Sequence, residues 1–135
     1  MSYNESKTVL RFEIPHLRGK SCGEVYEYFK PIIGEADEVD EWNGEIDYFH
    51  YERHRPLIPV FEMTYDKSKD DKVGVDYILC YENDYGKRQG KANHSIAELT
   101  ELSEKVAKKF GLDASMGRVV SYTWYNGGDE PIYFE

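Results

Sequence analysis

The chain has 135 residues, of which 40% are hydrophobic and 15% aromatic, and its formal net charge at pH 7 is −9. A chain of this length buries about two thirds of its unfolded surface and needs neither a metal nor a disulfide to fold. The acidic charge disfavours nucleic acids and membranes, the two cysteines do not form a disulfide framework, and the polar N-terminus lacks a signal-peptide core, so we expect a soluble cytoplasmic protein.

The first third of the chain predicts a strand followed by a helix. Apolar and polar residues alternate over residues 8–14, as in a half-buried strand. Ser21 and Glu24 have the spacing of a capping box, which opens a helix. Pro31 is expected to interrupt this helix, and Gly34 is expected to end it.

An acidic run without a single base follows the helix. Val39 and Trp42 lie three residues apart within it, a spacing that predicts a helical turn, and Asn43-Gly44 predicts a chain reversal. The acids of the run are Glu35, Asp37, Glu38, Asp40, Glu41, Glu45 and Asp47.

Three strands are predicted next, over residues 45–54, 60–65 and 73–81, with Pro56 and Pro59 separating the first two. The third is apolar on one face and partly apolar on the other, as a central strand would be. On the first strand, alternation assigns residues to two opposite faces. One face carries Tyr48, His50, Glu52 and His54, and the other carries Phe49, Tyr51 and Arg53.

The last third predicts a loop over residues 83–94, a helix, and strands over 118–125 and 131–134. Ser95 and Glu98 form a second capping box, and Gly111 ends the helix. An apolar stripe at the helical period predicts the buried side of this helix. It consists of Ile96, Leu99, Leu102, Val106 and Phe110.

The order strand, helix, three strands, helix, two strands (β-α-β-β-β-α-β-β) predicts one α+β domain over residues 1–135. We expect two layers, with two helices on one face of a mostly antiparallel sheet, in a ferredoxin-like or related fold. The other face of the sheet is left for water, a ligand or a second copy of the chain, so a homodimer through the sheet stays open.

The first candidate site is the acidic run together with its aromatic residues. Acidic surfaces with embedded aromatic side chains suit docking to a basic protein, because the carboxylates steer the encounter and the rings supply the anchoring contact. The alternative is a solvated connection that keeps the protein soluble. The partner-binding residues would be Glu35, Asp37, Glu38, Asp40, Glu41, Trp42 and Tyr48.

The second candidate is a divalent-metal site, for example for zinc, formed by His50, Glu52 and His54 on one strand face. It needs further ligands from elsewhere. Acid–base catalysis by a histidine with Tyr48 is a variant of the same idea. The alternative is the polar outer side of a half-buried strand.

The third candidate is the only basic island of the chain, where Lys87, Arg88 and Lys91 lie between two glycines or next to them. Its position after a strand and before a helix suits anion binding, but the P-loop spacing and hydroxyl are missing. The alternative is a solvated connection.

No catalytic motif is present, and the serines lack the nucleophile-elbow pattern. Cys22 lies in the first turn of a capped helix, which would lower a thiol pKa, but packing is the simpler interpretation. The sequence therefore favours a small binding or regulatory protein without catalytic activity or cofactor, which acts on a basic protein partner as an inhibitor or immunity protein does. The alternatives are a metal- or histidine-dependent enzyme and a small-ligand or phosphate-binding domain.

Overall fold

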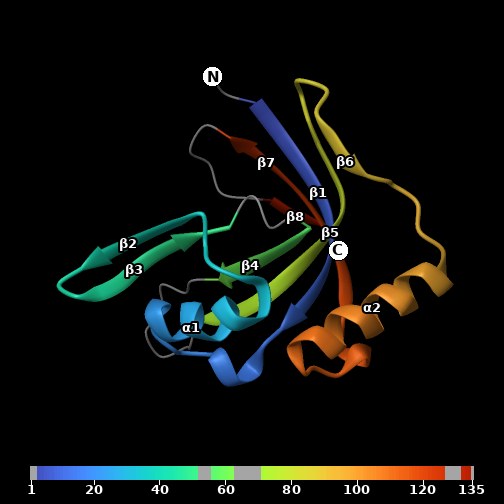
Figure 1. The fold of residues 1–135 in the computed structure, drawn as a ribbon. Helices are drawn as coiled ribbons and strands as arrows, with labels where there is room; N and C mark the ends of the chain where they lie inside the picture. The colour runs from blue at the N-terminus through green and yellow to red at the C-terminus, as the bar shows by residue number, and fades with distance from the viewer. Residues whose placement is uncertain (1–2, 52–55, 63–70, 127–131, 135) are drawn as a thin grey trace. The chain divides into compact units, whose positions relative to one another are not determined.

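The structure is a computed structural model that describes residues 3–51, 56–62, 71–126 and 132–134 (Figure 1). The chain is a small α+β protein with a mostly antiparallel sheet and two helices, as the sequence predicts. It divides into two compact units: the first comprises residues 1–11 and 77–135, and the second comprises residues 12–76. None of the described helices is long and apolar enough to cross a membrane.

The main sheet has the strand order β4-β5-β1-β7-β8, and β6 pairs with β5 beside this path. The strands are β1 (Tyr3–Glu13), β4 (Leu57–Glu62), β5 (Lys72–Asn83), β6 (Arg88–Gly90), β7 (Arg118–Asn126) and β8 (Ile132–Phe134). A separate two-stranded sheet consists of β2 (Glu38–Trp42) and β3 (Glu45–His50). β5 is an interior strand and is buried on both faces over most of its length, which confirms the prediction made from its apolar residues.

Both helices begin where their capping boxes predict. α1 (Cys22–Ile33) is capped by Ser21, and α2 (Ile96–Phe110) is capped by Ser95. In each case the serine side chain accepts from the backbone N–H of the glutamate three residues on, and that glutamate reaches back to the N-cap. These caps satisfy donors that a helix start otherwise leaves without partners.

In the second unit, α1 packs against the β2–β3 hairpin, and the ends of β1 and β5 complete the core (Figure 1). Tyr26 of α1 and Phe49 of β3 lie with ring centroids 5.2 Å apart, and Phe49 meets Phe61 of β4 edge-on at 5.0 Å. The buried apolar side chains of this unit are Phe12, Ile14, Leu17, Val25, Tyr26, Phe29, Phe49, Tyr51, Val73 and Val75.

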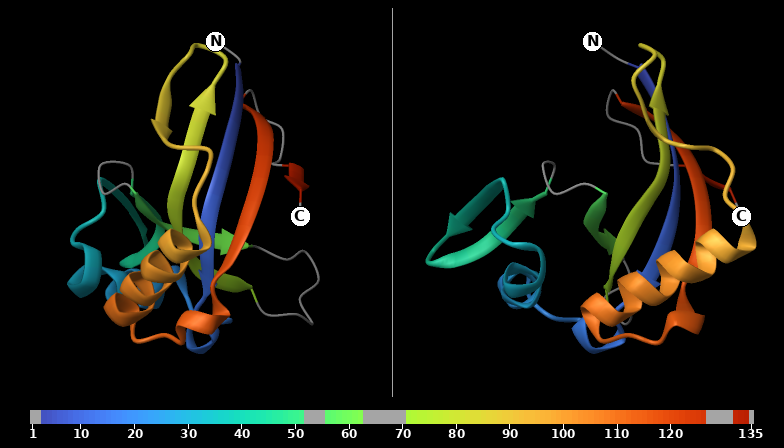
Figure 2. Two further views of the ribbon diagram at one scale, coloured as in Figure 1. Left: turned by 90° about the vertical axis from the view of Figure 1, so that its right-hand side faces the viewer. Right: turned by 45° about the vertical axis from the view of Figure 1, so that its right-hand side comes forward.

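In the first unit, the C-terminal half of α2 covers β1 and its neighbours, as Figure 2 shows. Val106, Ala107 and Phe110 are buried there, but Ile96 at the start of α2 is 84% exposed. The apolar stripe of α2 is therefore buried only in its second half. The other buried apolar residues of this unit are Val9, Leu10, Ile78, Leu79, Tyr81 and Val120.

Several sequence predictions of local structure are wrong. α1 continues through Pro31 to Ile33, although Pro31 has no N–H to donate to the carbonyl one turn back. β4 begins at Leu57 and contains Pro59, which an edge strand tolerates because one side of it has no ladder to complete. The strand predicted over 45–54 ends as β3 at His50, and the predicted loop 83–94 contains β6.

The predicted helical turn at Val39 and Trp42 is also wrong, because both residues lie in β2. The Asn43-Gly44 reversal brings this segment beside β3, and the two strands pair antiparallel. The pairing of β2 with β3 therefore determines the structure of this segment, and the helical spacing of Val39 and Trp42 does not.

Candidate functional site

The β2–β3 hairpin carries most of the acidic run. Asn43 (φ 51°) and Gly44 (φ 80°) both have positive φ, the geometry of a type I′ turn, whose twist matches that of the flanking strands. Trp42 and Glu45 face each other directly across this turn. The two-residue turn thus places the Trp42 indole and the Glu45 carboxylate side by side at the tip of the hairpin.

A β-bulge decides which side chains of the hairpin point outward. Asp40 pairs with Tyr48, but the next residue, Glu41, pairs with Ile46, so Asp47 is an extra residue in β3. The bulge resets the alternation, and both Ile46 and the buried Phe49 point to the α1 side.

The outward side of the hairpin is exposed and acidic. We call it the acidic hairpin face. Trp42 is 71% exposed on it and Tyr48 44%. The residues of the acidic hairpin face are Glu38, Asp40, Trp42, Glu45, Tyr48 and His50.

The side chains of this face interact with one another. The rings of Tyr48 and His50 stack with centroids 6.4 Å apart and planes 8° apart. The pKa of the Tyr48 hydroxyl is raised, first by partial burial and then by the neighbouring Glu38 and Asp40 carboxylates. The Glu38 and Asp40 carboxylates therefore lie close enough to the Tyr48 hydroxyl to add to the effect of burial.

The segment that enters the hairpin is fixed at several points. The Tyr51 hydroxyl donates to the Gly34 carbonyl at 2.6 Å, and the Ala36 amide donates to the Tyr26 hydroxyl at 3.2 Å. The Asp37 amide donates to the His50 carbonyl at 2.9 Å. Two buried tyrosines thus hold the hairpin on the end of α1, and the acidic hairpin face is presented by an anchored element.

All the partner-binding residues predicted from the sequence are exposed. Glu35 and Asp37 lie in the connection before β2, beside the hairpin rather than on its acidic face, and Glu41 points to the α1 side with Ile46. The other four predicted residues share the acidic hairpin face. Sequence alternation also separated Tyr48 and His50, which are exposed, from Phe49 and Tyr51, which are buried, and this separation is confirmed.

A shallow depression of about 750 Å³ adjoins the hairpin where the start of α1 meets the chain reversal. Its lining combines carboxylates with the side chain of Ile46 and two glycines. The sequence did not point to this place, because Glu24 and Glu27 are separated from Glu45 by about twenty residues. The lining residues are Ser21, Gly23, Glu24, Glu27, Gly44, Glu45 and Ile46.

The surroundings of Cys22 disfavour the thiolate form of its side chain. Its pKa is raised, first by burial and then by the Asp47 carboxylate, which the bulge of β3 brings near. The local rule that a helix start lowers a thiol pKa is overridden here by these two effects. Cys22 and Cys80 are both free.

The predicted metal site is only partly described. His50 is exposed on β3, whereas Glu52 and His54 lie outside the described residues. His16, a suggested additional ligand, packs edge-on against Tyr28 with centroids 5.0 Å apart. Within residues 3–51, 56–62, 71–126 and 132–134, no three His, Cys, Asp or Glu side chains are grouped as metal ligands. The metal site stays a prediction.

The basic segment around Lys87 is part of a hairpin between β5 and β6. The Asn83 side chain accepts from the amides of Tyr85 and Lys87, so these two N–H groups are already used. Arg88 forms an ion pair with Glu82 at 2.9 Å, and Lys91 forms one with Glu98 at 2.6 Å. An anion would have to compete with these carboxylates for the cations. Anion binding by Lys87, Arg88 and Lys91 also stays a prediction.

Comparison with known proteins adds no relative to this description: no protein-family model, no curated protein and no solved structure matches the chain.

Proposed function

We propose that the protein is a small binding or regulatory protein without catalytic activity, which docks on a basic protein partner through the acidic hairpin face. The observation that carries this proposal is the clustering of Glu38, Asp40 and Glu45 around the exposed rings of Trp42 and Tyr48 on one anchored hairpin. Such a surface is expected of inhibitors and immunity proteins that neutralise a basic target.

Each kind of side chain has a part in this docking. The carboxylates accelerate the encounter with a basic partner by electrostatic attraction. At physiological salt this attraction is screened at distances beyond the Debye length of about 8 Å. Trp42 supplies a large apolar contact and stacks on lysine or arginine side chains. Tryptophan and tyrosine are enriched among residues that dominate binding energy, where truncation costs about 2–4 kcal/mol.

The depression beside the hairpin also combines carboxylates with an apolar side chain. Glu24, Glu27 and Glu45 surround an apolar patch formed by Ile46. A lysine or arginine of the partner would lay its methylene stem on Ile46 and present its charge to the carboxylates. We include this depression in the proposed contact surface.

The proposal also includes a ferredoxin-like topology and a cytoplasmic location. With the β2–β3 hairpin and β6 left aside, the elements up to β7 follow the order β-α-β-β-α-β. This order supports a ferredoxin-like arrangement, into which the acidic hairpin is inserted between α1 and β4. Two free cysteines fit a reducing, cytoplasmic location.

The test uses a hairpin variant with the substitutions Glu38→Gln, Asp40→Asn and Trp42→Ala. The wild-type chain and the variant serve as baits for proteins from the native cell at several salt concentrations. We expect the wild type to retain basic proteins, with affinity falling as salt rises, and the hairpin variant to lose them.

The matched control variant carries Asp84→Asn, Tyr85→Ala and Glu101→Gln, which remove the same number of charges and one exposed ring from the first unit. It should behave as the wild type does. If the hairpin variant retained the same proteins with the same salt dependence, the acidic hairpin face would not be the contact surface.

A further inference from the structure

The outer edge of β2 has no neighbouring strand among the described residues. β2 and β3 form a sheet of two strands, in which β2 pairs only with β3. In both Figure 1 and Figure 2, β2 lies on the side of β3 that is farther from α1. All residues of β2 except the half-buried Val39 are exposed. The backbone along this edge is therefore accessible to another chain.

The turn of the hairpin determines which backbone groups point out of this edge. Residues that flank a two-residue turn form a hydrogen-bonded pair, and here they are Trp42 and Glu45. Hydrogen-bonded and non-hydrogen-bonded pairs alternate along an antiparallel ladder, so the adjacent Glu41 directs its N–H and C=O away from β3. Glu41 therefore offers one backbone donor and one backbone acceptor to a further strand.

The side chains of β2 on the acidic hairpin face each favour a cation beside them. Glu38, Asp40 and Trp42 alternate along β2, so every second side chain of an added strand would lie across from one of them. Opposite charges stabilise such cross-strand pairs, and an indole attracts lysine and arginine by a cation–π contact. On the other side of the hairpin, the half-buried Val39 favours an apolar neighbour. A segment that fits this edge alternates basic with apolar residues.

The same side chains disfavour a second copy of β2 at this edge. In an antiparallel pair of β2 strands centred on Asp40, the Asp40 carboxylate would face that of the other copy. In a parallel pair in register, every acid of β2 would lie beside its own copy. Like charges directly opposite each other destabilise a sheet. The charges of β2 therefore favour a basic segment over a second copy of this chain.

We propose that the outer edge of β2 binds an extended segment of the partner as a third strand, in which lysine or arginine occupies every second position. This inference rests on the proposed function, because it specifies how a basic partner docks on the acidic hairpin face. Only an extended segment uses the free backbone groups of the edge, since a helix bonds its own. A third strand also adds support to a hairpin of only two strands.

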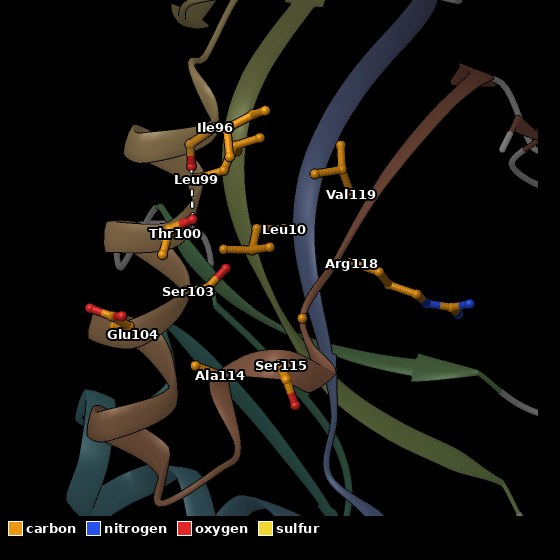
Figure 3. A pocket seen from close by; sticks show the side chains of 11 residues that line it. Leu10, Ile96, Leu99, Thr100, Ser103, Glu104, Ala114, Ser115, Arg118 and Val119 are labelled. Atoms are coloured by element: carbon orange, nitrogen blue, oxygen red, sulfur yellow. Dashed lines mark hydrogen bonds between the residues drawn. The ribbon is translucent and has the colours of Figure 1, made fainter.

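The first unit offers another exposed surface that an extended apolar segment would contact. A groove of about 370 Å³ lies between α2 and the strands β1 and β7, and Figure 3 shows Ile96 and Leu99 pointing from α2 toward the strands. The charged residues of its lining are Glu104 and Arg118, one of each sign. The groove therefore gives a basic segment no electrostatic preference, whereas the edge of β2 does.

The first experiment compares two synthetic peptides of equal length and charge. In one peptide lysine alternates with valine, and in the other lysine alternates with proline, which has no N–H and does not continue a sheet. NMR titration of the full chain gives both dissociation constants. We expect the lysine–valine peptide to bind about tenfold more tightly or better. It should also slow hydrogen exchange of the Glu41 amide by about tenfold or more, because this amide then donates to the added strand.

The second experiment removes the Glu41 amide. Glu41→Pro lacks the N–H that points out of the edge, and Glu41→Ala is the matched control because both variants lose the same carboxylate. Proline is tolerated in an edge strand where its nitrogen faces solvent. We expect Glu41→Pro to bind the lysine–valine peptide about tenfold more weakly than Glu41→Ala does. Thermal unfolding verifies that both variants are folded, and if Glu41→Pro is not, hydrogen exchange of the wild-type amide decides.

The third strand is refuted if the lysine–valine peptide binds no better than the lysine–proline peptide, or if it leaves exchange of the Glu41 amide unchanged. It is equally refuted if the peptide perturbs the NMR signals of Ile96 and Leu99 instead of those of β2. Exchange of the Glu41 amide that slows as the free protein is concentrated would assign the edge to a second copy. In each of these cases, continued capture of basic proteins through the acidic hairpin face would leave the proposed function standing. Absence of basic proteins from those that the wild type captures would refute the proposed function and, with it, the third strand.

Discussion

Tyr51 connects the end of α1 to the strand that carries the acidic hairpin face, and its hydroxyl is the group to test. The side chain is 2% exposed, and the hydroxyl donates to the Gly34 carbonyl at 2.6 Å. Tyr51→Phe keeps the ring and removes this donor from a part-buried carbonyl. Loss of a buried hydrogen bond with one partner left behind costs about 1–3 kcal/mol, and we expect about 2 kcal/mol here.

Urea unfolding followed by circular dichroism measures this loss as a change in the free energy of unfolding at constant m value. The matched control is Tyr48→Phe, three residues earlier on the exposed side of β3, which should change stability by less than about 0.5 kcal/mol. A loss below that limit for Tyr51→Phe would refute the idea that this hydrogen bond holds the hairpin on α1.

The same hydrogen bond predicts a pH dependence. The pKa of Tyr51 is raised above its usual 10.0, first by burial and then by Tyr26 and the carboxylates of Asp37 and Glu35. A raised pKa in the folded state means that the stabilisation is complete below pH 10 and is lost as pH rises further. The stability advantage of the wild type over Tyr51→Phe should fall by up to about 1.4 kcal/mol per pH unit above pH 10. An advantage that stays constant up to pH 11.5 would contradict this account.

Four further substitutions, one of them a control, test other parts of the structure. Gly74→Ala should destabilise the protein by about 1–3 kcal/mol in urea unfolding, because the added methyl would lie 2.5 Å from the Phe12 carbonyl oxygen of the neighbouring strand. The control is Gly86→Ala, whose added methyl would have no atom within 4 Å. It should show only the smaller cost of placing alanine at a positive φ. Ser95→Ala should cost about 1 kcal/mol by removing the N-cap of α2, and no loss would mean that the cap is replaced. Trp42→Ala should leave the unfolding midpoint unchanged and still abolish capture of basic proteins, because the indole is 71% exposed; unchanged capture would count against its anchoring role.

Much of the acidic hairpin face was predictable from the sequence. The acids are contiguous in the chain, the Asn43-Gly44 turn is a local signal, and period-two alternation distinguishes Tyr48 from Phe49. The bulge at Asp47 was not predictable, because it depends on how β2 and β3 match across the turn. That bulge determines that Glu41 leaves the acidic hairpin face and that Asp47 approaches Cys22.

The sequence by itself determined the features that depend on neighbours in the chain: two capped helices, the interior strand β5, the reversal at Gly44 and the acidic run. Only the tertiary structure decided features that depend on distant segments. The sheet covers only the second half of α2, which leaves Ile96 exposed. An apolar stripe in the sequence indicates which side of a helix can be buried. The position of the sheet determines how much of that side is buried.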